Sequence, residues 1–220
     1  IGANMNWIKE RQEIVEYGIK MNEEGLSSGT SGNLSIYIPK DNVVLITPSG
    51  IDYLKMEIED IVAIDLDGTV LEGERKPSSE WQLHTLCYKN KPQIHGVVHT
   101  HSIYCTVFST LRMPIEAVHY AIADVNSNCN KILCTDYYRY GTKELAEAVV
   151  KTMGESYAVL LANHGLVTCG SSLNGAFGLA REAEYVAKIQ HLAMSIGKPH
   201  ILTYEEMEEV KNGFKSYGQK

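Results

Sequence analysis

The segment VVHTHS at residues 97–102 is an apolar run that ends in two histidines one residue apart. Side chains along a β-strand alternate between its two faces, so His99 and His101 point the same way from the end of a buried strand. Imidazole is a common zinc ligand, and a catalytic zinc site usually has three protein ligands and one open position. The pair therefore predicts either part of a metal site or two polar residues where a strand meets a loop.

A third histidine, His164, lies in the segment LLANHGL at residues 160–166, again where an apolar strand ends. Gly165 beside it lets backbone approach closely, so three histidines at strand ends could meet around one ion. Of the other histidines, His84 and His191 lie in helical patterns. His95 lies four residues before His99, too far to share its ion easily. The weaker candidates are His84, His95, His119, His191 and His200.

Length, composition and charge narrow the class of protein. With 220 residues, 44% of them hydrophobic, the chain can bury one core and is expected to form one domain. It has no run of eighteen apolar residues, so we expect no membrane span. A net charge of -7 and a pI of about 5.6 argue against a nucleic-acid partner and favour a small-molecule ligand.

The N-terminus and the cysteines indicate the compartment. Ile1–Asn4 look like an expression remnant ahead of Met5, so we expect the domain to span residues 5–220. The N-terminus lacks the layout of a signal peptide, which predicts a cytoplasmic protein. The five cysteines form no Cys-x-x-Cys pair, which fits structural thiols in a reducing compartment. They are Cys87, Cys105, Cys129, Cys134 and Cys169.

Hydrophobic spacing and turn residues predict the secondary structure. Helices are expected at residues 7–24, 80–89, 102–111, 142–153, 172–196 and 203–213. Strands are expected at residues 34–38, 43–47, 61–64, 69–71, 97–100, 158–161 and 166–169. Ser78 or Ser79 is expected to cap the second helix, and Thr203 with Glu206 forms a capping box for the last. The order of elements predicts one α/β domain with a mostly antiparallel central sheet covered by helices.

Glu80 lies at the first turn of a predicted helix, beside two serines. A carboxylate at this place either complements the helix dipole or transfers a proton beside a metal. Taken alone, the helix dipole is the simpler interpretation, because helix N-termini generally favour acidic residues.

Three short segments are rich in Gly, Ser, Thr and Asn. Such segments offer backbone N–H groups and hydroxyls to a phosphate, although each one alone is equally an ordinary loop. Their occurrence together with the three histidines favours an anion site. The segments are residues 29–33, 47–50 and 78–79.

Six short motifs, in this order, resemble the zinc-dependent class II aldolase and sugar-phosphate epimerase family. They are GTSGNLS at residues 29–35, TPSG at 47–50, PSSEW at 77–81, VHTH at 98–101, HY at 119–120 and NHGL at 163–166. The resemblance extends from about Met5 to Tyr217. Within the family the pattern is most similar to the enzymes that cleave L-fuculose 1-phosphate.

The resemblance implies roles for individual residues. Zinc would be bound by His99, His101 and His164, with Glu80 as a fourth ligand that becomes the catalytic acid/base when substrate displaces it. The substrate phosphate would lie against Asn33, Ser49, Gly50, Ser78 and Ser79. Tyr120 would act in the neighbouring subunit's site of a fourfold-symmetric homotetramer, and Tyr217 matches a mobile C-terminal catalytic tyrosine.

The resemblance also implies a reaction, the reversible cleavage of a ketose 1-phosphate to dihydroxyacetone phosphate and an aldehyde. For L-fuculose 1-phosphate the aldehyde is L-lactaldehyde. Alternatives within the family are a methylthioribulose-1-phosphate dehydratase and a pentulose-5-phosphate 4-epimerase. Alternatives of other classes are a non-enzymatic interaction module like the adducin head and a generic zinc hydrolase. Residues 123–130 depart from the family's pattern, in the wall that would face the aldehyde.

Overall fold

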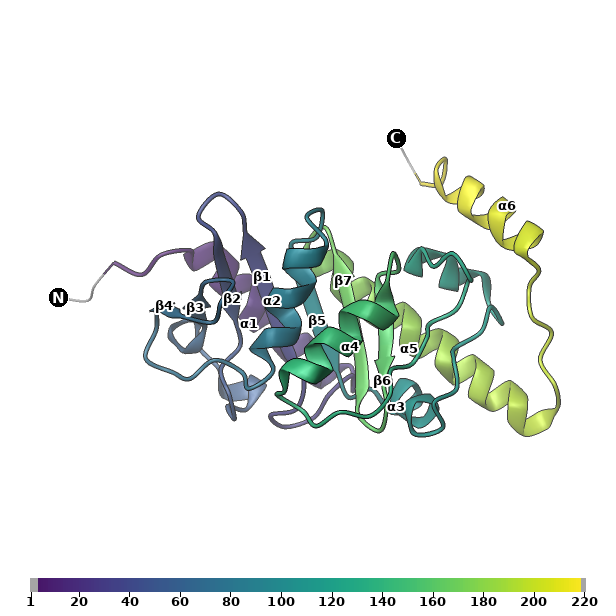
Figure 1. The fold of residues 1–220 in the computed structure, drawn as a ribbon, viewed down its shortest axis with the longest axis horizontal. Coiled ribbons are helices and arrows are strands. Elements are labelled where there is room, and N and C mark those ends of the chain that lie inside the picture. The colour runs from purple at the N-terminus through teal and green to yellow at the C-terminus, as the bar shows by residue number, and fades with distance from the viewer. Residues whose placement is uncertain (1–3, 219–220) are drawn as a thin grey trace.

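A computed structural model describes residues 4–218, so all but Asn4 of the expected remnant Ile1–Asn4 lies outside the described residues. A central sheet lies between two layers of helices (Figure 1). None of the described helices combines the length and the apolar composition needed to cross a membrane. The helices are α1 (Ile8–Glu23), α2 (Trp81–Asn90), α3 (Ile103–Thr110), α4 (Lys143–Met153), α5 (Leu173–Ile196) and α6 (Tyr204–Phe214). The strands are β1 (Asn33–Ile38), β2 (Val43–Ile46), β3 (Val62–Ile64), β4 (Val70–Glu72), β5 (Gly96–Thr100), β6 (Ala158–Leu161) and β7 (Gly165–Gly170).

The seven strands form one sheet in the order β4-β3-β2-β1-β5-β7-β6, and each of its pairings is antiparallel. Alternate side chains point to opposite faces, which divides the core in two. Val98 and Leu166 belong to the half that packs against α1, α3 and α5. Val97 and Val167 belong to the half that packs against α2 and α4. The predicted α/β domain with a mostly antiparallel sheet is confirmed.

The pairing of β1 with β5 positions the predicted metal ligands. Asn33 is the register partner of His99, and Ser35 is the partner of Val97. Because residues of equal parity share a face, His99 lies on the side of the sheet that α2 covers. The C-terminal end of β5 and the start of α2 therefore lie at the same end of the strands (Figure 1).

The start of α2 differs from the prediction that Ser78 or Ser79 caps this helix, and that prediction is wrong. Glu80 occupies the N-cap position, with no capping hydrogen bond from its side chain. The serines form a turn ahead of the helix, in which Trp81 N–H donates to the carbonyl of Ser78 over 3.1 Å. The Ser78 hydroxyl accepts from Glu80 N–H instead, at 3.2 Å. The Glu80 carboxylate is thereby left to turn away from the helix end.

The C-terminal segment lies beyond the end of the sheet (Figure 1). The predicted capping box is confirmed, because Thr203 Oγ1 accepts from Glu206 N–H and the Glu206 carboxylate accepts from Thr203 N–H. The helix α6 packs on η3 (Tyr120–Val125), a 3₁₀ helix that the sequence pattern did not predict. This contact brings the C-terminal end of the chain close to Tyr120.

The close packing of α5 on β5 predicts a large cost for a methyl group at Gly96. A Cβ atom built there lies 2.6 Å from the Cα of Leu173, which is backbone that cannot rotate away. We expect Gly96→Ala to lower the free energy of unfolding by about 1–3 kcal/mol, the usual cost of overpacking a core. Denaturant unfolding followed by circular dichroism measures this loss.

The matched control is Gly178→Ala on α5, where the added methyl group meets nothing within 4 Å. Helix propensity favours alanine there by up to about 1 kcal/mol. Equal unfolding free energies for the Gly96→Ala protein and the parent would contradict the close approach of α5 to β5.

Candidate active site

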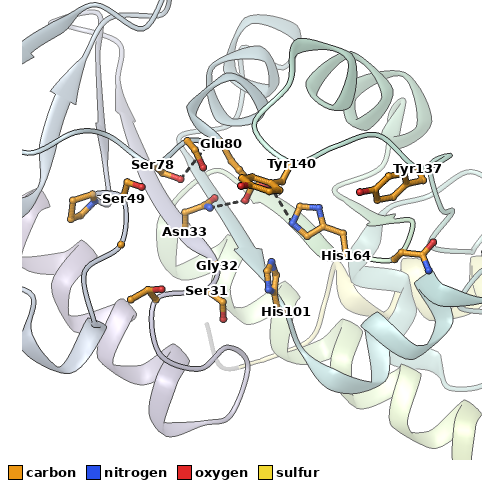
Figure 2. Close-up of a pocket in the computed structure, with 15 residues that line it drawn as sticks. Ser31, Gly32, Asn33, Ser49, Ser78, Glu80, His101, Tyr137, Tyr140 and His164 are labelled. Carbon is orange, nitrogen blue, oxygen red and sulfur yellow. Dashed lines mark hydrogen bonds and ion pairs between the residues drawn. The ribbon is translucent and has the colours of Figure 1, made fainter.

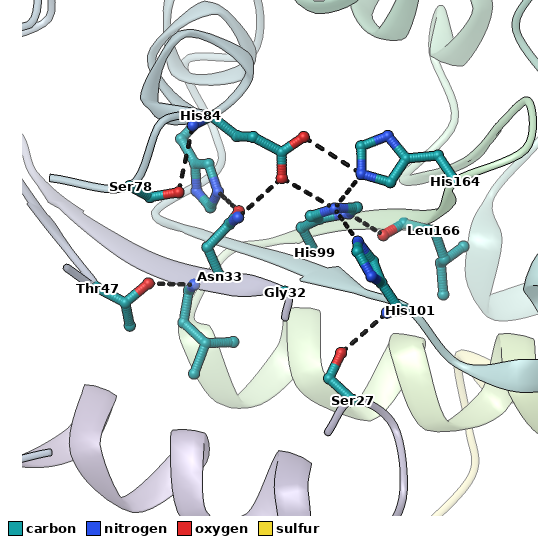
Figure 3. Close-up of polar contacts among 12 residues, drawn as sticks. Ser27, Gly32, Asn33, Thr47, Ser78, His84, His99, His101, His164 and Leu166 are labelled. Atoms are coloured by element: carbon teal, nitrogen blue, oxygen red, sulfur yellow. Dashed lines mark hydrogen bonds and ion pairs between the residues drawn. The ribbon is translucent and has the colours of Figure 1, made fainter. Parts of the chain in front are cut away.

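The three predicted histidines meet at one end of the central strands (Figure 3). His99 is near the end of β5, His101 follows that strand, and His164 lies in the tight turn between β6 and β7. The antiparallel pairing of β5 with β7 brings the end of one strand beside the start of the other. As a result, His99 Nε2 lies 3.1 Å from His164 Nε2 and 3.2 Å from His101 Nε2.

The Glu80 carboxylate lies beside the histidines rather than over the end of its helix. Its Oε2 is 3.1 Å from His99 Nε2, and its Oε1 is 3.3 Å from His164 Nε2. The Asn33 side-chain amide donates a hydrogen bond of 3.0 Å to Oε2. Only 7% of the residue is exposed, so this carboxylate is a buried member of the cluster.

The distances and hydrogen bonds of the cluster fit a divalent cation. Tetrahedral ligands about 2.1 Å from an ion are about 3.4 Å apart, close to the distances between these nitrogens and oxygens. Glu80 Oε1 is buried and has no hydrogen-bond partner among the described residues, which is costly without a positive charge nearby. His99 Nδ1 donates to the carbonyl of Leu166 over 2.9 Å, which leaves the Nε2 lone pair directed at the cluster.

The electrostatics leave two of the imidazoles neutral near pH 7. Burial, with His99 adding to it, lowers the pKa of His101 to about 4 and that of His164 to about 3. Burial also acts to lower the pKa of His99, but the Glu80 carboxylate outweighs it and raises that pKa above its usual value. Burial acts to raise the pKa of Glu80, yet the attraction of His99 leaves it well below its usual value. The carboxylate and these two imidazoles are therefore in the forms that bind metal, and an ion bound at the cluster would take the place of a proton on His99.

A cavity of about 270 Å³ opens beside the cluster (Figure 2). Its lining includes all five residues predicted to bind phosphate, together with Glu80, His101 and His164. The part of the lining formed by the predicted residues consists of small polar side chains and loop backbone, which can bind an oxygen-rich anion. The five predicted residues are Asn33, Ser49, Gly50, Ser78 and Ser79.

Two tyrosines of the cavity wall were missed by sequence reasoning. Tyr137 and Tyr140 come from the irregular segment before α4 and lie over the cavity (Figure 2). Gly141, with φ of +73°, holds this segment against Ser79, whose carbonyl oxygen is 3.0 Å from a Cβ built on the glycine. The available signal was the run YYRY at residues 137–140, which is unusually aromatic for a loop.

Tyr120 and Tyr217, the two tyrosines predicted to act in catalysis, do not line this cavity. Both line a separate groove of about 820 Å³ between η3, α5 and α6, together with His119 and Phe214. Tyr120 is 54% exposed and Tyr217 is 89% exposed. Within one chain the fold brings these tyrosines to each other and not to the histidines.

Comparisons with known proteins agree with the geometry. The family model for the class II aldolase and adducin N-terminal domain matches residues 12–191. A 5-deoxy-D-ribulose 1-phosphate aldolase of Bacillus thuringiensis is 44% identical over 96% of this chain and 98% of its own. An L-fuculose phosphate aldolase of Haemophilus influenzae is 40% identical over 97% of both chains. A solved L-fuculose 1-phosphate aldolase superposes with a TM-score of 0.92 at 42% identity, over 97% of this chain and 100% of that one.

The cluster predicts one divalent metal ion per chain, because its atoms lie at ligand spacing. We expect His99→Ala, His101→Ala and His164→Ala each to strip the ion, since a three-histidine site rarely tolerates the loss of one ligand. Elemental analysis of the purified proteins measures the metal content. His200→Ala, a change at an exposed histidine, is the control and should keep the ion. Metal retained in all three cluster variants would show that the ion binds elsewhere.

Proposed function

The chain belongs to the class II aldolase and adducin N-terminal domain family, and we propose that it is a zinc aldolase that cleaves a ketose 1-phosphate reversibly to dihydroxyacetone phosphate and an aldehyde. The observation that supports this most directly is the meeting of three histidines with Glu80 at the edge of a small polar cavity. An interaction module of the adducin kind has no need of such a cluster. The aldolase names of the relatives favour cleavage over the dehydratase and epimerase alternatives.

The substrate that we propose is a ketose 1-phosphate whose last carbon is a methyl group. The two relatives described above are named for substrates of this form, 5-deoxy-D-ribulose 1-phosphate and L-fuculose phosphate. Cleavage between C3 and C4 yields dihydroxyacetone phosphate from either one. The second product is acetaldehyde from the first and L-lactaldehyde from the second, so the two substrates differ only at the aldehyde end.

The phosphate end of the substrate would lie against Asn33, Ser49, Gly50, Ser78 and Ser79. These residues present neutral N–H and O–H donors, which bind a phosphate by hydrogen bonds. The phosphate takes no part in bond breaking. Its binding energy can therefore hold C2 and C3 in register with the reacting groups.

The reacting groups would lie at the histidine cluster. Zinc bound by His99, His101 and His164 supplies a Lewis acid for the negative charge that develops on the substrate oxygens. In the direction of condensation, Glu80 takes a proton from C3 of dihydroxyacetone phosphate, and C3 then forms its bond to the aldehyde carbon. The neighbouring subunit's Tyr120 protonates the alkoxide that results, with Tyr217 beside it at the aldehyde end.

We further propose a homotetramer, in which neighbouring chains complete each other's sites. The half-exposed Tyr120 lies in a groove apart from His99, His101 and His164 of its own chain, so a role in catalysis requires a second chain. Cyclic symmetry repeats one such contact around a closed ring. The cytoplasm is the proposed compartment, because the five cysteines are free thiols and one of them, Cys129, is exposed.

The proposed reaction is tested with a panel of ketose 1-phosphates and the metal-loaded protein. We expect release of dihydroxyacetone phosphate, read by a coupled dehydrogenase, from L-fuculose 1-phosphate and from 5-deoxyribulose 1-phosphate. The ratio of the two values of kcat/KM assigns the preferred aldehyde. Methylthioribulose 1-phosphate and a pentulose 5-phosphate serve as tests of the dehydratase and the epimerase. Dehydration or epimerisation without any release of dihydroxyacetone phosphate would refute the aldolase.

The role of Glu80 is tested by Glu80→Gln, which keeps the shape of the side chain and removes its basic carboxylate. We expect exchange of one C3 hydrogen of dihydroxyacetone phosphate with deuterated water to fall by at least about 100-fold, the lower range for general-base catalysis. The three histidines remain, so the metal content should stay close to that of the parent. Proton NMR follows the exchange without any aldehyde, so neither Tyr120 nor the aldehyde wall affects the result.

The control is Glu144→Gln, the same chemical change at an exposed glutamate in the first turn of α4. It should exchange the hydrogen at the parental rate. If metal-loaded Glu80→Gln also exchanges at that rate, another group must be the base.

Shared sites predict complementation between two inactive proteins. Tyr120→Phe chains keep their histidines, and His99→Ala chains keep their tyrosine. Mixed oligomers formed by subunit exchange therefore contain some sites in which an intact His99 faces an intact Tyr120. We expect a recovery of cleavage activity on mixing, read against each variant alone. A fully active monomer in analytical ultracentrifugation would contradict the shared site.

A further inference from the structure

A chain of buried polar groups lies behind Glu80, between α2 and β1. Glu80, His84 and Tyr88 recur at intervals of four residues and share one face of the helix, while Asn33 and Ser35 share one face of the strand. His84 and Ser35 are fully buried, and Tyr88 is 3% exposed. The proposed reaction uses Glu80 and Asn33 and leaves the other three groups without a role.

Hydrogen bonds connect these groups in one line (Figure 3 shows the part from His84 to Asn33). Tyr88 Oη lies 2.7 Å from Ser35 Oγ and 3.0 Å from the Ser35 carbonyl oxygen, so its one proton is shared between these two acceptors. Ser35 Oγ lies 2.6 Å from His84 Nδ1, and His84 Nε2 lies 2.5 Å from Asn33 Oδ1. The Asn33 amide nitrogen then donates to Glu80 Oε2.

The orientation of the Asn33 amide determines which atom donates in each hydrogen bond of this line. Its nitrogen must face Glu80, because an ionised carboxylate accepts hydrogen bonds and cannot donate them. Its oxygen then faces His84 and requires a donor there, so His84 carries a proton on Nε2. Burial lowers the pKa of His84 to about 3, so the neutral ring has no second proton and Nδ1 accepts from the Ser35 hydroxyl.

The other tautomer of His84 would reverse the donor and acceptor roles in these hydrogen bonds. With the proton on Nδ1, the Nε2 lone pair would need a donor, and the Asn33 amide would have to rotate to supply one. Its oxygen would then face the Glu80 carboxylate, so that two acceptors would meet in a buried site with no proton between them. The position of one proton on His84 is therefore coupled to the geometry of the carboxylate.

We propose that His84 is a positioning residue, which donates from Nε2 to Asn33 and so holds the Asn33 amide and the Glu80 carboxylate in their reactive orientation. This inference rests on the proposed role of Glu80 as the base. Asn33 also lines the cavity, and its amide nitrogen has a second N–H beyond the one that Glu80 accepts. His84 thereby connects the group that moves the proton with the site that binds the phosphate.

The first test is the tautomer of His84 in the parent protein, read by ¹⁵N–¹H correlation NMR of the imidazole nitrogens. We expect a protonated Nε2 and an unprotonated Nδ1, both in protein freed of metal by a chelator and in protein loaded with zinc. A proton on Nδ1 would overturn the inference. This measurement needs no variant and no activity.

The second test compares two substitutions of His84. His84→Phe keeps a planar ring and removes both nitrogens, and we expect it to lower C3 exchange of dihydroxyacetone phosphate by about 10–100-fold, as the loss of supporting hydrogen bonds does at metal sites. His84→Gln again offers an N–H where Nε2 lies, and it should restore most of the exchange. A merely structural role would not distinguish the two variants in this way once both are folded.

The matched control is Thr85→Val, because Thr85 is the next residue on α2, is also buried, and bonds only to its own helix. It should exchange at the parental rate. Parental exchange in folded His84→Phe, with Glu80→Gln inactive, would overturn this inference alone. Parental exchange in Glu80→Gln would instead overturn the proposed base. If His84→Phe does not fold, the tautomer and the activity of His84→Gln decide, and an inactive but folded His84→Gln contradicts the proposal.

Discussion

The antiparallel register of β1 against β5 is the constraint on which the rest of the site depends. It sets Asn33 opposite His99, and the side chains of both strands on that face meet α2. A slip of one residue would turn His99 and His101 to the face that α5 covers, because strand side chains alternate. Buried apolar side chains on both faces of β5 make such a slip costly, so packing of the core fixes the position of the metal ligands.

The charges of the site also constrain one another. Of the described residues that line the cavity, none is a lysine or an arginine, and Glu80 contributes a buried negative charge. A phosphorylated substrate brings more negative charge into this small volume. Neutral donors can bind the phosphate oxygens, but they cannot offset the repulsion between the phosphate and the carboxylate. A divalent cation among the histidines would offset this repulsion, so the ion proposed to activate the substrate would also favour its binding.

The elements and residues with a local signal could be predicted from the sequence. The alternation of β5 showed that His99 and His101 share a face, and Thr203 with Glu206 indicated the last helix. Strand order could not be predicted, since each pairing joins segments far apart in the chain. The cap of α2 was predicted wrongly because the Ser78 hydroxyl accepts from the N–H of Glu80, the N-cap residue itself, and not from an N–H of the first helical turn. Tyr137 and Tyr140 were missed because the path of an irregular segment depends on its contact with Ser79.

The phosphate end and the aldehyde end of the proposed substrate would contact different parts of the fold. The residues proposed to bind the metal and the phosphate lie at strand ends, at the start of α2 and in tight turns, all of which the sheet holds in place. In the proposed tetramer, a neighbouring chain's Tyr120, which lies on η3, would face the aldehyde end. Residues 123–130, which depart from the family's pattern, begin within η3 and leave the histidines untouched. On the proposed function, changes in that part would alter which aldehyde fits and would leave the three histidines in place.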